Sequence, residues 1–161
     1  MYQSLTQVIP PAQDGELFKG ITNLYPLWQK LTPETIRIST MISLAVLILS
    51  GCTTISGHLY LWPNGCRPDD SIEAAAGMRF HASRGSMSLG QSRGGLPPDA
   101  LVENEAAILT DTQRVIERYH EARRGSMLRI VVAPCSPFSM SQELMSQPAW
   151  PAILTFHCIP I

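Results

Sequence analysis

Apolar side chains recur at helical spacing in the first third of the chain. Between residues 14 and 31, six of them fall on one face of a helix, which Pro26 should kink. They are Leu17, Phe18, Ile21, Leu24, Tyr25 and Trp28. Thr32 then offers an N-cap and Pro33 a first helical residue, so a second helix should begin here and end at Gly51. Because its second half is apolar on nearly every side, we expect that helix to be buried.

Strand-like segments rich in β-branched and aromatic residues follow the second helix. They lie at residues 53–62, 78–83 and 128–133. Helical segments are expected at 69–76, at 103–123 and again from Ser139. Strands that alternate with helices predict βαβ units and a parallel sheet. The chain is therefore expected to have an α/β fold.

The longest stretch without a regular pattern joins the second predicted strand to the next helix. It runs from Arg84 to Leu101 and is rich in glycine, proline and serine. Loops of this length are usually either functional or disordered. In parallel α/β folds the chemistry sits at the carboxyl ends of the strands. The candidate side chains at those ends are His58, Tyr60, Arg84, Ser86, Gln91, Cys135 and Ser136.

The candidate side chains also have interpretations without catalysis. His58 and His81 lie in strand-like segments, where a histidine is commonly a hydrogen-bonded packing residue. His120 lies on the predicted helix at 103–123 next to Glu121, which fits a solvated surface. No base can be identified within reach of Cys135, so we do not expect covalent catalysis. The sequence contains no His-x-His, no HExxH and no Walker-type glycine loop.

Composition narrows the classes of partner. Of the 161 residues, 45% are hydrophobic and 16% are charged, and the net charge of −1 gives no electrostatic reason to bind nucleic acid. The four cysteines are far apart and form no CxxC pair, which argues against a zinc knuckle and against a disulfide scaffold. They are Cys52, Cys66, Cys135 and Cys158. We therefore expect reduced thiols in a cytoplasmic protein that binds neither nucleic acid nor a membrane.

One apolar segment allows a different interpretation. Residues 41–52 read MISLAVLILSGC, which resembles the signal of a bacterial lipoprotein with Cys52 as the lipidated residue. Such signals stand at the N-terminus behind positive charge, whereas a helical pattern precedes this segment. A run of this length is more often a core helix than a membrane span. A non-enzymatic lipoprotein and a small α/β binding module remain as alternatives to an enzyme.

Three longer segments carry a resemblance to a known family. They are GCTTISGHLYLWPNGC at 51–66, FHASRGSMSLGQSRGGLPPD at 80–99 and LRIVVAPCSPFS at 128–139. Together they resemble the amidohydrolase superfamily, in its 8-oxoguanine deaminase and triazine hydrolase branch. The resemblance implies an incomplete (β/α)8 TIM barrel of the metal-dependent hydrolase type, with about three to four βα units, because a whole barrel needs about 250 residues.

The resemblance also implies a function, the hydrolysis of C–N bonds of a purine-like heterocycle by a deaminase. Relatives hold zinc or iron through a His-x-His motif on strand 1 and further ligands on later strands, and the metal makes hydroxide available near neutral pH. The family pattern would place the strand-1 histidines before Met1. We therefore expect no metal site, no catalytic residue and no activity in this chain alone. The parent is expected to be a homo-oligomer that binds a small-molecule heterocycle.

Four residues are predicted from this resemblance to contact the substrate, namely Gln3, Arg84, Cys135 and Ser136. Gln3 follows the expected metal motif and has an amide suited to pairing with a ring N–H and a carbonyl. Arg84 stands just past the end of a predicted strand and offers five hydrogen-bond donors. Its alternative role is to anchor the glycine-rich loop through backbone carbonyls.

The last residues depart from the family pattern. We expect a partial amidohydrolase barrel over 1–145 and a divergent tail over 146–161 that is not native to the fold. Where relatives should present His-Thr-His, the chain reads AILTFHCIPI. Back-translating residues 155–161 in another frame permits Val-Ser-Leu-His-Thr-His. A frameshift in the coding sequence would account for this tail.

Overall fold

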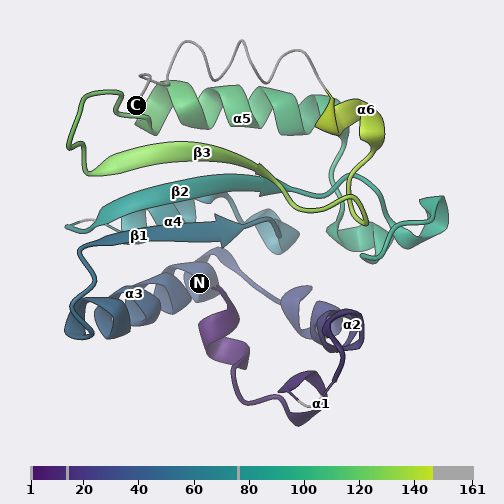
Figure 1. Ribbon diagram of the computed structural model, residues 1–161. Coiled ribbons are helices and arrows are strands. Elements are labelled where there is room, and N and C mark those ends of the chain that lie inside the picture. The colour runs from purple at the N-terminus through teal and green to yellow at the C-terminus, as the bar shows by residue number, and fades with distance from the viewer. Residues whose placement is uncertain (1, 14, 76, 147–161) are drawn as a thin grey trace.

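The computed structural model describes residues 2–13, 15–75 and 77–146 (Figure 1). The first elements are η1 (Tyr2–Thr6), α1 (Pro10–Gln13), α2 (Leu17–Trp28) and α3 (Pro33–Leu49). The strands are β1 (Thr54–Leu59), β2 (Arg79–Ser86) and β3 (Leu128–Pro134). Between and after them lie η2 (Pro63–Gly65), α4 (Pro68–Ala74), η3 (Gln91–Arg93), η4 (Asp99–Leu101), α5 (Glu105–Tyr119) and α6 (Gln142–Met145). The divergent tail expected over 146–161 lies, apart from Ser146, outside the described residues.

The sheet is parallel and has the strand order β1-β2-β3. Figure 1 shows the three arrowheads pointing the same way, with α3 beside β1 and α5 beside β3. Apolar side chains of α3, α4 and α5 pack with one face of the sheet. This core includes Leu44, Ile55, Ile72, Phe80, Val115 and Ile130. The α/β fold with alternating strands and helices is thus confirmed.

The boundaries of α3 follow the predicted signals. The Thr32 side chain accepts a hydrogen bond from the Thr35 backbone N–H, and the Thr35 side chain accepts one from the Thr32 N–H, so each caps the other. Pro33 is the first helical residue. Gly51 has a φ of +85°, a left-handed conformation that glycine adopts without steric cost, and the helix ends just before it.

The predicted burial of the second half of α3 is wrong. Leu44 is buried, but large apolar neighbours are exposed, and Leu49 keeps 88% of its surface accessible. The exposed apolar residues of this half are Met41, Ile42, Val46, Ile48 and Leu49. Only one side of α3 meets β1, α4 and η1, whereas an apolar sequence carries no information about whether a partner covers the other side.

The second strand is longer than its composition predicts. Arg84, Gly85 and Ser86 continue β2 because they pair in register with Val132, Ala133 and Pro134 of β3. Backbone pairing with a neighbouring strand overrides the weak strand propensity of glycine and serine. Arg84 therefore lies within a strand, not past its end as the sequence suggested.

The glycine-rich segment after β2 is a compact loop. Its two ends meet where the Glu103 N–H donates to the carbonyl of Met87 at 2.8 Å. Inside the loop, the Ser92 hydroxyl and backbone N–H both donate to the Asp99 carboxylate, at 2.9 and 3.2 Å. Further backbone bonds join the loop to residues 138–139 after β3. These contacts make it a packed loop of the Ω type, in which a long connection carries ordered structure.

An ion pair joins α4 to α5 behind the sheet. Asp69 accepts hydrogen bonds from Arg114 at 2.6 and 3.0 Å and from the Tyr119 hydroxyl at 2.8 Å. These bonds, those of Arg114 first, lower the pKa of Asp69 to about 2, although burial acts in the opposite direction. An unfolded aspartate has a pKa near 3.9. The charged form therefore stabilises the fold above about pH 4, and this stabilisation is lost as the pH falls towards 2.

We expect Asp69→Asn to lower the thermal midpoint clearly at pH 6 and only slightly near pH 2, because about half of the wild-type carboxylates are then protonated and most of the stabilisation is lost. Thermal unfolding followed by circular dichroism at several pH values measures this difference. Glu117→Gln on the exposed side of α5 removes the same charge and serves as the control. A gap between Asp69→Asn and wild type that stays constant from pH 6 to pH 2 would contradict the assignment.

Candidate active site

The carboxyl ends of the three strands meet at one edge of the sheet. β1 leads into Tyr60, β2 ends at Ser86, and β3 leads into Cys135, whose N–H donates to the carbonyl of Ser86 at 3.1 Å. Figure 1 shows the glycine-rich loop beyond the arrowheads, with α2 on the same side. In parallel α/β sheets this edge is where ligands bind. We refer to it as the carboxyl edge.

Strand geometry divides the candidate side chains between two faces. Along a strand successive side chains point to opposite faces. His58 pairs with Ser83 on the face that the helices do not cover, and His58 is exposed. Arg84 pairs with Leu59 on the opposite face, the one packed against the helices. Arg84 and His58 are therefore not neighbours in one site, although both lie near the carboxyl edge.

The Arg84 side chain is 1% exposed and its guanidinium lies between two carboxylates. It binds Glu103 through Nη1 and Nη2 at 3.1 and 2.8 Å, and Asp111 through Nε at 2.8 Å. Nη1 also donates to the carbonyl of Gly85, and the group lies 4.9 Å from the centre of the Trp62 ring. Four of its five N–H groups thus bind acceptors within the described part of the chain. The predicted substrate contact stays a prediction, with one N–H left for it.

Cys135 and Ser136 follow β3 directly and are both partly buried. Burial raises the pKa of the Cys135 thiol, and the hydroxyls of Ser139 and Ser136 offset this in part. The thiol is therefore protonated at neutral pH and is a poor nucleophile. The Ser136 hydroxyl lies 3.0 Å from the Ser139 hydroxyl, which fixes the turn after the strand. Contact of these two side chains with a ligand stays a prediction.

Gln3 lies on a different element from the other predicted contacts. Gln3 is an exposed residue of η1, and its backbone carbonyl accepts a hydrogen bond from the Thr6 hydroxyl. η1 is held to α3 by Ser4, whose hydroxyl lies 2.6 Å from that of Ser39. It is also joined to α2, because the indole N–H of Trp28 donates to Thr6 at 3.4 Å. The structure thus anchors the segment that carries Gln3, and its substrate contact stays a prediction.

Two tyrosines meet Cys135 at the carboxyl edge. Tyr25 of α2 is buried, and burial raises the pKa of its hydroxyl, with Tyr60 and Cys135 adding to the rise. The ring of Tyr60 contacts the ring of His58, with 5.2 Å between their centres. Sequence reasoning named Tyr60 as a strand-end residue but assigned Tyr25 only to a helix face. Its spacing is that of an ordinary core residue, so no local signal distinguishes it.

The described residues do not supply a metal site. In that part of the chain, no three side chains of histidine, cysteine, aspartate or glutamate come together where they could hold a metal ion. A catalytic zinc takes three protein ligands. His58 and His81 lie on the uncovered face of neighbouring strands, but two imidazoles do not make such a set. The described part therefore does not fit a catalytic metal by itself.

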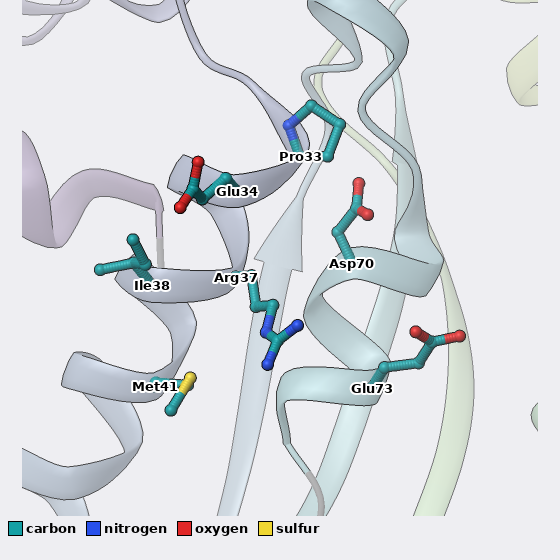
Figure 2. A pocket seen from close by; sticks show the side chains of 7 residues that line it. All are labelled: Pro33, Glu34, Arg37, Ile38, Met41, Asp70 and Glu73. Atoms are coloured by element: carbon teal, nitrogen blue, oxygen red, sulfur yellow. The ribbon is translucent and has the colours of Figure 1, made fainter.

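A groove of about 560 Å³ lies between α4 and the N-terminal half of α3. Figure 2 shows Arg37 extending from α3 towards α4, on which Asp70 and Glu73 lie. Ile38 and Met41 form its apolar side. None of the strand-end candidates lines this groove. We place the candidate site at the carboxyl edge because the strand-end side chains converge there.

Relatives with similar sequences are deaminases and related hydrolases. The 8-oxoguanine deaminase of Pseudomonas aeruginosa is 45% identical over 148 residues, which cover 89% of this chain and 33% of the relative. The hydroxydechloroatrazine ethylaminohydrolase of Pseudomonas sp. strain ADP is 38% identical over 127 residues, or 76% of this chain and 26% of the relative. No family model matches the chain. The chain thus spans about one third or less of these relatives.

Solved structures show the same relationship. The atrazine chlorohydrolase of Arthrobacter aurescens complexed with zinc superposes with a TM-score of 0.84 and 29% identity, over 96% of this chain and 36% of that chain. This neighbour is a TIM-barrel enzyme, and the three-stranded parallel sheet with its helices is consistent with part of such a barrel. The predicted fold class is therefore confirmed.

The matches also bear on the alternatives. They cover so much of the chain that they include the segment ending at Cys52, so the lipoprotein interpretation finds no support. None of the described helices is long and apolar enough to cross a membrane. Similarity over 89% of the chain to a deaminase also makes a separate small binding module the less economical interpretation. Sequence and structure thus place the chain in the amidohydrolase superfamily, in its 8-oxoguanine deaminase and triazine hydrolase branch.

Proposed function

We propose that the chain is part of a metal-dependent hydrolase that deaminates a purine-like heterocycle, with 8-oxoguanine as the first substrate to test. The 45% identity to an 8-oxoguanine deaminase along nearly the whole chain carries this proposal. The carboxyl edge supports it, because three strand ends and α2 bring polar and aromatic side chains together there. Hydrolysis uses water to replace the bond between a ring carbon and its exocyclic amino group by a C–O bond, and the amino group leaves as ammonia.

In this proposal the chain contributes binding groups. Of the four predicted contacts, Gln3, Cys135 and Ser136 touch the heterocycle, whereas Arg84 is buried between two carboxylates. The amide of Gln3 can donate to a carbonyl and accept from a ring N–H. The metal, zinc or iron, is held by residues other than the described ones. It would supply a Lewis acid and a bound water of lowered pKa. The isolated chain is accordingly expected to turn over no substrate.

The proposal also covers the cellular compartment and the assembly of the enzyme. The described cysteines Cys52, Cys66 and Cys135 are free, and burial raises the pKa of Cys66 to about 11, which fits reduced thiols in the cytoplasm. The exposed apolar residues of α3 and α2 fit an enzyme in which further elements or a second copy cover them, as in a homo-oligomer.

The test is a chimera in which this chain replaces the matched segment of the Pseudomonas aeruginosa 8-oxoguanine deaminase. We expect the zinc-loaded chimera to release ammonia from 8-oxoguanine. Gln3→Ala should lower kcat/KM by about 2- to 12-fold, the value of one lost hydrogen bond to an uncharged group. The unaltered deaminase and the isolated chain are the controls. A folded, metal-loaded chimera that deaminates neither 8-oxoguanine nor guanine would overturn the proposal.

A further inference from the structure

The glycine-rich loop at 88–102 forms part of a groove at the carboxyl edge. Gly94, Gly95 and Leu96 line a space of about 280 Å³ together with Phe18 of α2 and Phe138 after β3. The two phenyl rings meet edge to face with 5.0 Å between their centres, and both remain about half exposed. Exposed aromatic rings beside flat peptide groups form a surface that suits a planar ring. The groove therefore offers an aromatic surface on which a planar heterocycle can stack.

The position of the loop decides whether this groove exists. Leu96 donates its N–H to the carbonyl of Phe138 at 2.8 Å, so one wall is attached to the other. The N–H groups of Ser88 and Leu89 both donate to the carbonyl of Ser139, at 2.8 and 3.0 Å. These bonds hold the loop to the segment after β3. They do not fix it against the helices behind the sheet.

Arg84 supplies that second attachment. Its guanidinium binds Glu103, the residue whose N–H closes the loop on Met87. The same guanidinium also binds Asp111 of α5. Asp111 also accepts a bond from Arg114, which pairs with Asp69 of α4. A chain of ion pairs thus connects the base of the loop to α4 and α5.

The energetic balance makes this connection sensitive to the loss of the arginine. Arg84 is 1% exposed, and its two carboxylate partners are 23% exposed. A buried ion pair contributes little net stability, but the removal of one partner leaves uncompensated charge. Without Arg84, Glu103 and Asp111 would repel each other next to the loop closure. The loop end would then move towards water.

We propose that Arg84 is a positioning residue, which through Glu103 and Asp111 holds the glycine-rich loop as one wall of a groove for a planar heterocycle, and which does not itself touch the ligand. The proposal rests on the proposed function for the identity of the ligand only. The clamp itself, Arg84 with Glu103 and Asp111, is a property of the chain.

Hydrogen exchange of the 161-residue chain, followed by mass spectrometry, tests the clamp without any activity. We expect Arg84→Met and Glu103→Gln to speed exchange of the Leu89, Gly95 and Leu96 amides by about tenfold or more, with the ladder amides of β1–β3 unchanged. Arg84→Lys keeps the charge but not the forked geometry and should restore protection only in part. Arg118→Met removes an arginine that is 60% exposed and should change nothing. Unchanged loop exchange, or equal acceleration of loop and sheet in both Arg84→Met and Glu103→Gln, overturns the proposal.

Kinetics of the chimera distinguish positioning from direct contact. A positioning role predicts that Arg84→Met and Glu103→Gln raise KM for 8-oxoguanine similarly, by about tenfold, and that the double variant is no worse than either. If Arg84 touches the ligand, Glu103→Gln leaves KM unchanged and the proposal fails. A metal-loaded chimera without activity, combined with the expected exchange result, counts against the proposed function and leaves the clamp established.

Discussion

Replacing Trp28 by alanine is expected to lower the free energy of unfolding by about 3–5 kcal/mol. Trp28 is 0% exposed and lies where α2 packs on the strand ends, with its ring 5.8 Å from that of Tyr25. Its neighbours in this cluster include Leu59, the last residue of β1, and Met87, which directly precedes the glycine-rich loop. The deletion leaves a large cavity that surrounding side chains fill only in part. Urea unfolding followed by circular dichroism measures the effect.

Leu17→Ala on the same helix is the matched control for Trp28→Ala. Leu17 is 71% exposed, so its loss should change the free energy of unfolding by less than about 0.5 kcal/mol. If the two variants unfold at the same urea concentration, α2 does not pack on the carboxyl edge as described. Because Tyr25 lies on this helix, such a result would also remove it from the candidate site.

Gly95→Ala is expected to lower the free energy of unfolding by about 3 kcal/mol, the upper part of the usual range for overpacking. A Cβ at this position would overlap the carbonyl group of Leu89, which is backbone and cannot move aside by rotating a side chain. The loop would have to open between Leu89 and Leu96. We therefore expect faster amide exchange throughout the loop as well.

Gly94, the neighbouring glycine, is the control that separates backbone strain from crowding. Gly94 has a φ of +83°, but a Cβ there meets nothing within 4 Å. Gly94→Ala should therefore cost only the strain of a left-handed alanine, about 1 kcal/mol. Urea unfolding of both variants separates crowding from backbone strain. Equal losses at the two positions would mean that the loop is not packed as tightly as the structure shows.

Much of the backbone could be predicted from the sequence. Thr32, Pro33 and Gly51 marked the limits of α3, and the β-branched segments marked the three strands. The family resemblance at 80–99 pointed to the deaminase branch that the relatives confirm. Local signals succeed here because capping bonds, a positive φ and side-chain alternation involve residues a few positions apart.

The candidate site was only partly predictable. The sequence pointed to strand ends and named Arg84, Cys135 and Ser136, but it placed Arg84 past its strand. It could not show that Tyr25 joins Tyr60 and Cys135, because these residues come from α2 and from the segments that follow two different strands. The same limit applies to the metal, since residues that hold an ion must converge from distant segments, and the described ones form no such group.

The sequence by itself determined the element order, the parallel α/β class and the family, since each of these depends on patterns within one segment. Tertiary structure alone decided which side chains pair and which faces are covered. Arg84 meets Asp111, 27 positions away, and Arg114 meets Asp69 across 45 positions. In the same way, half of α3 is apolar and yet exposed. The physical reason is that burial and charge pairing depend on what lies nearby in space, and only folding brings distant segments together.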